Sequence, residues 1–213
     1  RLDGRRILLG VDRLDYTKGI RARLTAFETL IERRPSTAED TVFLQVAVPS
    51  REAAHGYAET RNEIERLVGH LNGRFGTFGR VPVQYHYGSL DRPALVAHYR
   101  AADVMVVTPP RDGMNLVALE FVACRVRNRG ALILSEFAGA AKLLQPALRV
   151  NPYDVDGIAD AYEQALSMPI EEQRRRMRLM RSQVRRHDVH RWARRAVAAF
   201  AGTMEPVVPG DAR

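Results

Sequence analysis

The sequence predicts an α/β fold, in which one doubly wound, mostly parallel, Rossmann-like sheet carries helices on both faces. Three observations predict it. Short apolar runs alternate with longer amphipathic segments along the 213 residues. The apolar runs are continuous, as strands buried on both faces require. Hydrophobic residues make up 46% of the chain, which suffices for a sizeable core. We expect one domain over residues 1–201 and a frayed tail at 202–213.

The first half of the chain is expected to open with a strand at 5–11, where the run RRILLGV is apolar and short. Over 20–35 apolar residues recur every three or four positions, which predicts a helix ending before Pro35. The next elements are a strand at 41–48, a long helix over 56–76 closed by Gly73, and a strand at 81–88.

The second half begins with a helix over 91–102, for which Asp91 is the expected N-cap and Pro93 lies in the first turn. A strand at 103–109 and a helix over 115–126 follow. The remaining predicted elements are a strand at 130–136, a short helix at 140–144, a strand at 147–152, and helical segments starting near Val155, Pro169 and Asp188.

Charge and cysteine content exclude several classes of protein. The net charge is +8, but much of the excess lies in one helical segment, where Met177, Met180 and Val184 recur between arginines. This pattern is typical of an amphipathic helix with a solvated basic face, and we expect no nucleic-acid partner. The single cysteine, Cys124, is expected to be a buried small side chain in a reducing cytoplasm. We see neither a signal peptide nor a membrane span.

The loop after the first strand, GVDRLDYTKGI, carries two cations at the carboxyl end of that strand. Ligands of open α/β sheets lie beyond these strand ends. Arg13 and Lys18, beside a helix N-terminus, can hold a diphosphate through charge-assisted hydrogen bonds. The competing interpretation is a set of surface salt bridges between Arg13, Asp15 and Lys18. A similar arginine, Arg51, follows the second strand and, taken alone, is typical of a solvated side chain.

The loop after the fourth strand, TPPRDGMNLVALE, combines an acid, a glycine and the start of a helix. Gly113 is expected to allow an unusual backbone conformation and a close approach of ligand. The backbone N–H groups of 114–117 suit negative oxygens, and Asp112 and Glu120 can accept hydrogen bonds from sugar hydroxyls. The alternative is that Asp112 or Asn115 merely caps the helix.

Several stretches together resemble the carboxyl-terminal half of the trehalose-6-phosphate synthase family. They are VDRLDYTKGI, PSRE, TPPRDGMNLVALEFVACR and GALILSEFAGAA, and the resemblance extends from about Arg5 to Phe200. It implies the carboxyl-terminal, donor-binding domain of a GT-B glycosyltransferase. The implied reaction is retaining transfer of glucose from UDP- or GDP-glucose to glucose 6-phosphate, which gives trehalose 6-phosphate.

The resemblance also implies roles for individual residues. Arg13 and Lys18 would grip the donor diphosphate, and Asp112 would bind glucose hydroxyls. Backbone groups of Gly113, Met114 and Asn115 would help Asp112 to bind the sugar, and Leu116 and Val117 would offer N–H groups to the diphosphate. Glu120 would hold the ribose and Leu90 would lie near the base. Arg51 would reach toward the acceptor phosphate.

The implied chemistry needs no metal and no cofactor. In this family the leaving diphosphate is described as helping to deprotonate the acceptor during front-face displacement. Cations and a helix N-terminus would then stabilise the leaving group. The chain has no close carboxylate pair of the kind that retaining hydrolases use and no Asp-x-Asp metal motif. His86, His98, His187 and His190 are expected to be surface or packing residues.

Two departures from the family pattern leave alternatives open. Leu119 stands where family members usually carry Lys, which admits a carbasugar pseudoglycosyltransferase of the validoxylamine type or a glucosylglycerol-phosphate synthase. The amino-terminal acceptor domain is missing, so the chain alone is expected to be inactive. A non-catalytic sugar-nucleotide-binding module is a further alternative, and a homo-oligomer stays open.

Overall fold

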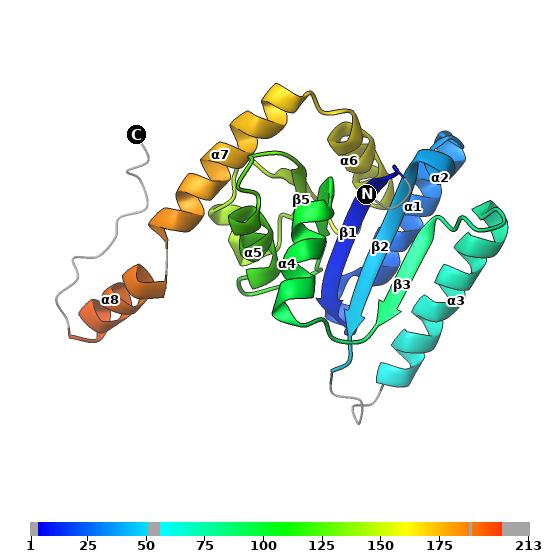
Figure 1. Ribbon diagram of the computed structural model, residues 1–213. Coiled ribbons are helices and arrows are strands. Elements are labelled where there is room, and N and C mark those ends of the chain that lie inside the picture. The colour runs from blue at the N-terminus through cyan, green and yellow to red at the C-terminus, as the bar shows by residue number, and fades with distance from the viewer. Residues whose placement is uncertain (1–3, 51–55, 188, 202–213) are drawn as a thin grey trace.

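The computed structural model describes residues 4–50, 56–187 and 189–201. Its centre is a six-stranded sheet in the order β3-β2-β1-β4-β5-β6, and each pair of neighbouring strands is parallel (Figure 1). The predicted doubly wound α/β fold is thereby confirmed. The strands are β1 Arg6–Arg13, β2 Thr41–Val48, β3 Val83–Tyr87, β4 Val104–Val107, β5 Ala131–Ser135 and β6 Leu148–Val150.

Helices cover both faces of the sheet. On one face α1 packs against α3 and α6, and on the other α5 packs against α4 and α7 (Figure 1). The α-helices are α1 Ile20–Arg33, α2 Thr37–Asp40, α3 Tyr57–Phe75, α4 Arg92–Ala101, α5 Leu116–Cys124, α6 Val155–Ser167, α7 Ile170–Arg186 and α8 Val189–Phe200, and the 3-10 helices are η1 Tyr16–Lys18 and η2 Gly139–Lys142.

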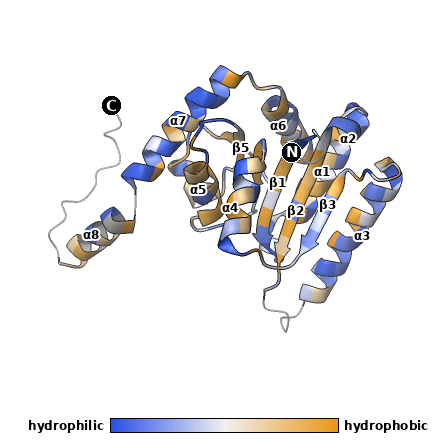
Figure 2. Cartoon of the chain, in the orientation of Figure 1, coloured by the Kyte–Doolittle hydropathy of each residue, from blue (hydrophilic) through white to orange (hydrophobic). Residues whose placement is uncertain are grey.

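The core forms two layers because successive side chains of a strand point to opposite faces. Leu8 belongs to the layer beneath α1 and α6, whereas Leu9 belongs to the layer beneath α4 and α5. Both are fully buried. Burying a side chain of this size contributes about 1.5–3 kcal/mol. Figure 2 shows the apolar strands between helices whose outer faces are polar.

The basic segment forms α7, as predicted. Met177 and Met180 are buried against the sheet, and Val184 is partly buried beside them. The arginines lie on the outer side, where Glu172 pairs with Arg175 and Arg176. Hydrogen bonds from these arginines lower the pKa of Glu172 to about 2. In the described ranges, no helix is both long enough and apolar enough to cross a bilayer.

Some element boundaries were wrong. Gly73 does not close the second long helix, because α3 continues to Phe75 and Gly76 is its C-cap. The last turn is held by Asn72, whose side-chain amide exchanges two hydrogen bonds with the backbone of Val83. The short elements η1 and α2 were not predicted, and the helix expected at 140–144 is the 3-10 turn η2. The tail at 202–213 lies outside the described residues.

Candidate functional site

The candidate site lies where the strand order reverses. Strand β1 is followed by a helix on one face of the sheet and its neighbour β4 by a helix on the other. Ligands of open α/β sheets bind at such a switch point, and we call the region between the loops after these two strands the crevice. One ion pair joins the loops: Lys18 Nζ lies 2.7 Å from Asp112 Oδ2. The side chains are 14% and 17% exposed, so the pair is shielded but open to solvent. Two residues predicted separately are thus brought together.

The loop after β1 is shaped by Asp15 and Gly19. The Asp15 carboxylate caps η1, accepting hydrogen bonds from the Thr17 amide at 2.9 Å and the Thr17 hydroxyl at 2.8 Å. Gly19 has a φ of +67°, and a methyl group there would collide with the carbonyl oxygen of Thr108. Only glycine therefore lets this loop pass so close to the end of β4.

Arg13 stands apart from these contacts. Its guanidinium is exposed, with a long hydrogen bond of 3.4 Å to the Ser50 hydroxyl. Within the described ranges it forms no salt bridge with Asp15, and Lys18 pairs with Asp112 instead. The alternative of salt bridges between Arg13, Asp15 and Lys18 is therefore wrong. Arg13 remains available to an anion at the crevice.

Asp112 is the centre of the second loop. Its carboxylate accepts hydrogen bonds from Lys18, from Asn115 Nδ2 at 3.1 Å and from the Met114 amide. Partial burial alone would raise the pKa of Asp112. The hydrogen bond and charge of Lys18, followed by the bonds from Asn115 and Met114, outweigh burial and hold that pKa below its ordinary value. Asp112 is therefore a carboxylate near neutral pH.

Asn115 caps α5, and Asp112 does not. Asn115 Oδ1 accepts a hydrogen bond from the Ala118 amide at 3.1 Å. Asn115 also takes the left-handed conformation, with a φ of 69°, that was expected of Gly113. Gly113 has no positive φ and has open space around it. The expectation of an unusual backbone conformation at Gly113 is wrong, because Asn115 makes the sharp turn. Gly139 packs closely on the Gly113 carbonyl.

Two apolar side chains at the start of α5 are exposed. Met114 is 47% exposed and Leu116 is 63% exposed. The Met114 amide was expected to be free for a ligand, but it donates a hydrogen bond to Asp112. Val117 and Leu90 are half-buried against the core beneath α4 and α5.

Glu120 is held by a partner that the sequence did not reveal. Its Oε2 accepts a hydrogen bond from the hydroxyl of Tyr99, on α4, at 3.0 Å. Burial, followed by the charge of Glu120, raises the pKa of Tyr99, so this hydroxyl stays a donor. Glu120 is otherwise exposed, and its second carboxylate oxygen has no partner within the described part of the chain.

A buried ionic network beneath the crevice was missed. Arg23, on α1, is fully buried and donates to Asp12 at 2.6 Å, to Gln45 at 3.1 Å and to Thr108 at 3.2 Å. It also reaches the carbonyl of Lys18 at 3.2 Å. Burial raises the pKa of Asp12, while the adjacent guanidinium opposes that rise. The signal was available, because Arg23 lies on the apolar face of its helix.

Arg51 lies outside the described residues, so its expected position is not seen. Among the residues that are described, no three His, Cys, Asp or Glu side chains come close enough to hold a metal ion.

Comparison with known proteins gives one consistent family. The model of glycosyltransferase family 20 matches residues 1–201. Trehalose-6-phosphate synthase of Mycobacterium avium (strain 104) is 54% identical over 197 residues, which cover 92% of this chain and 40% of that protein. The enzyme of the same name from Mycolicibacterium vanbaalenii is 56% identical over 203 residues, or 95% of this chain and 41% of that protein.

Solved structures agree. A UDP-forming α,α-trehalose-phosphate synthase of Burkholderia xenovorans, in complex with glucose 6-phosphate, superposes with a TM-score of 0.92 at 42% identity, over 94% of this chain and 45% of that one. The Escherichia coli protein bound with UDP-2-fluoro glucose gives 0.91 at 38% identity, over 93% and 44%. The chain therefore spans about two fifths of the length of the curated relatives it matches.

Proposed function

Because the chain belongs to glycosyltransferase family 20, we propose that it is the donor-binding half of a retaining transferase that makes trehalose 6-phosphate. The donor is UDP-glucose or GDP-glucose and the acceptor is glucose 6-phosphate. The observation that carries the proposal is the Lys18–Asp112 pair at the switch point of the sheet. Relatives with this fold include one solved with glucose 6-phosphate and one with UDP-2-fluoro glucose.

The geometry supports separate roles for the residues along the crevice, each binding a different part of the donor. The donor diphosphate lies between Arg13, Lys18 and the N-terminus of α5, where the amides of Leu116 and Val117 begin the helix. Asp112 accepts hydrogen bonds from glucose hydroxyls. Glu120, oriented by Tyr99, holds the ribose at the other end of the donor.

The Lys18–Asp112 pair gives the site a resting state. Without ligand, each charge neutralises the other at 2.7 Å. An arriving diphosphate competes for Lys18 and releases one lone pair of Asp112 toward the sugar. Donor binding then exchanges one charge-assisted hydrogen bond for others.

Catalysis follows from the same groups. As the glycosidic bond breaks, negative charge grows on the leaving diphosphate, and Arg13, Lys18 and the start of α5 stabilise it from fixed positions. The diphosphate takes up the acceptor proton, so the described residues supply no separate general base. This chemistry calls for neither a metal nor a cofactor. A cytoplasmic location fits the sugar-phosphate substrates.

The relatives favour this function over the carbasugar and glucosylglycerol alternatives. Leu119, which departs from the usual Lys of the family, packs partly buried against the core beneath α4 and α5. The backbone groups at the start of α5 are unaffected by that change.

The proposal is tested by joining the chain to the part of a family member that it does not match. We expect no trehalose 6-phosphate from the 213-residue chain alone, because transfer needs both reactants held in line. Fusing it to the amino-terminal half of a family member should restore synthesis, and Lys18→Ala in the fusion should abolish it. An isolated chain that transfers glucose, or a folded fusion that binds donor without transfer, would contradict the proposal; the second result would favour a non-catalytic binding module.

A further inference from the structure

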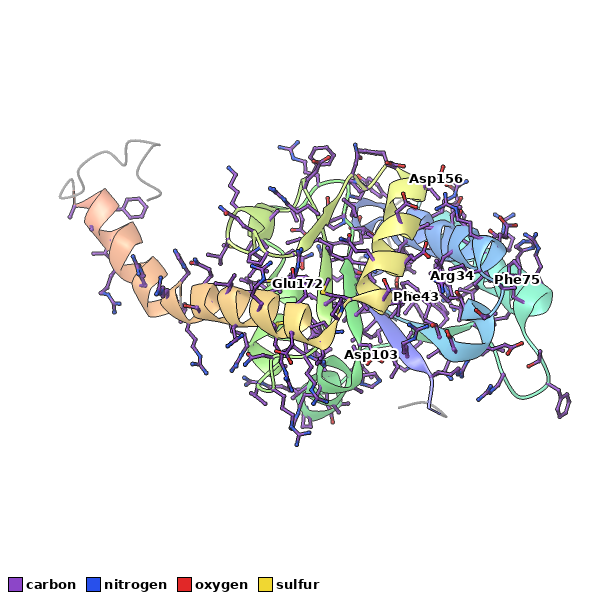
Figure 3. The ribbon with its side chains drawn as sticks, turned by 90° about the horizontal axis from the view of Figure 1, so that it is seen from above. Arg34, Phe43, Phe75, Asp103, Asp156 and Glu172 are labelled. Atoms are coloured by element: carbon purple, nitrogen blue, oxygen red, sulfur yellow. The ribbon has the colours of Figure 1, made fainter. Side chains whose placement is uncertain are left out.

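A second cavity lies at the opposite edge of the sheet from the donor crevice. It has a volume of about 590 Å³ and is bounded by the starts of β1, β4 and β5 and by the ends of α4, α5 and α6. Figure 3 looks onto this edge and labels Asp103, which lies in the cavity wall directly before β4. Its size falls within the range of small-molecule sites.

The wall of this cavity is strongly basic. Five arginines line it, Arg6, Arg100, Arg125, Arg127 and Arg129. Among the lining residues, Asp103 is the one carboxylate, and it already accepts a hydrogen bond from the Ile7 amide at 2.9 Å. We call this feature the arginine cavity.

Two of the arginines have structural tasks. Helices that end at this edge direct their carbonyl groups toward it, and these would repel an anion. Arg125 covers them by donating to the carbonyls of Tyr99 at 2.9 Å and Arg100 at 2.8 Å. Arg6 donates to the carbonyl of Leu166 at 3.1 Å and pairs with Asp40. The repulsion from the helix ends is thereby offset.

The other three arginines of the cavity do not donate hydrogen bonds to the carbonyl groups of the helix ends in the described part of the chain. The side chains of Arg100, Arg127 and Arg129 are exposed and have no hydrogen-bond or ion-pair partner among the described residues. They come from two segments: Arg100 from the end of α4, and Arg127 and Arg129 from the loop 125–130 between α5 and β5. Guanidinium groups that converge from different segments match the geometry of phosphate oxygens.

We propose that the arginine cavity binds a small phosphorylated molecule through Arg100, Arg127 and Arg129. The site is separate from the donor crevice, since it lies at the amino ends of the strands and the crevice at their carboxyl ends. The ligand is small because the cavity, and not an open face, gathers the charges. A polyanionic backbone such as nucleic acid would instead need charge spread along a surface.

The test titrates inorganic pyrophosphate into the chain carrying Lys18→Ala, which weakens the donor crevice. Adding Arg127→Gln and Arg129→Gln should lower the remaining affinity about tenfold or more, as loss of hydrogen bonds to charged groups implies. The matched control is Arg66→Gln with Arg80→Gln, which removes the same charge from exposed positions away from the cavity. It should leave the affinity unchanged. Equal losses in both variants, or none in the first, would overturn the proposal.

Two further measurements locate the ligand. Ala101→Leu narrows the cavity without changing charge, because Ala101 lines it and is exposed. This variant should also weaken binding; unchanged affinity would show an open basic patch and overturn the cavity site.

Cys124, the single cysteine, lies in the same wall. Pyrophosphate should slow its alkylation by iodoacetamide in the Lys18→Ala chain, and an unchanged rate would also count against the proposal.

Discussion

At the scale of single residues, the site consists of charged side chains whose present partners a ligand can replace. Lys18 is bound to Asp112, Arg13 is exposed, and Glu120 is oriented by Tyr99. None of these charges is deeply buried without a partner, so a ligand can compete for them. The cost of releasing Lys18 is moderate, because the pair is in contact with solvent.

Removing either cation should weaken nucleotide binding. We expect Arg13→Ala and Lys18→Ala each to reduce the affinity for UDP by about 1.5–3 kcal/mol, the range for hydrogen bonds to charged groups. The matched control is Arg21→Ala, on α1, whose side chain is 72% exposed and pairs with Glu63. Isothermal titration calorimetry measures all three. Wild-type affinity in both cation variants would remove these residues from the site.

The Asp112 carboxylate should also make stability depend on acid pH. Its pKa in the folded chain is lowered, so the folded state binds its proton less readily than the unfolded state does. The stabilisation is complete above the unfolded pKa, about 4, and is lost as the pH falls from there through the folded pKa. Asp112→Asn cannot titrate.

Urea unfolding at about pH 6 and about pH 3 checks this sign. The free energy of unfolding of the wild-type chain should fall more between these pH values than that of Asp112→Asn. Parallel losses in the two proteins would show that Asp112 has the same pKa in both states.

At the scale of elements, the crevice rests on the junction of α1 with the strands β1, β2 and β4. Arg23 connects Asp12 at the end of β1, Gln45 in β2 and Thr108 after β4. Its main-chain carbonyl accepts the hydroxyl of Tyr162 from α6 at 3.0 Å. A fully buried guanidinium with this many partners fixes the relative positions of the two binding loops.

Removing Arg23 alone should lower the free energy of unfolding more than removing Arg23 and the Asp12 charge together. We expect Arg23→Met to destabilise the chain by about 3–5 kcal/mol, because Asp12 is left buried and uncompensated. Adding Asp12→Asn should recover part of that loss, since the orphaned charge is removed. Urea unfolding of the two variants compares them. A double variant less stable than Arg23→Met would mean that the Asp12 charge is not what destabilises it.

Sequence patterns predicted the elements well because their causes are local. Continuous apolar runs gave the six strands, and Asp91 caps α4 as expected, accepting a hydrogen bond from the Ala94 amide. The errors involve contacts between segments distant in sequence. The role of Asn72 depends on β3, the partner of Glu120 lies on α4, and the Arg23 network joins residues 12 to 108. Gly113 was misjudged because a neighbouring asparagine makes the turn.

At the scale of the whole molecule, the two proposed sites lie at opposite edges of the sheet. The carboxyl ends of the strands form the donor crevice, whose proposed occupant is a nucleotide sugar. The amino ends form the arginine cavity, which the established family relationship does not require. The chain corresponds to about two fifths of the length of its curated relatives.

The most direct test of the donor assignment is calorimetry of UDP-glucose and of UDP with the wild-type chain and Asp112→Asn. If Asp112 reads the sugar, the variant should bind UDP-glucose about tenfold or more weakly. It should bind UDP as well as the wild type or better, because Lys18 is freed from its ion pair. Equal changes for both ligands, or none for either, would contradict the account.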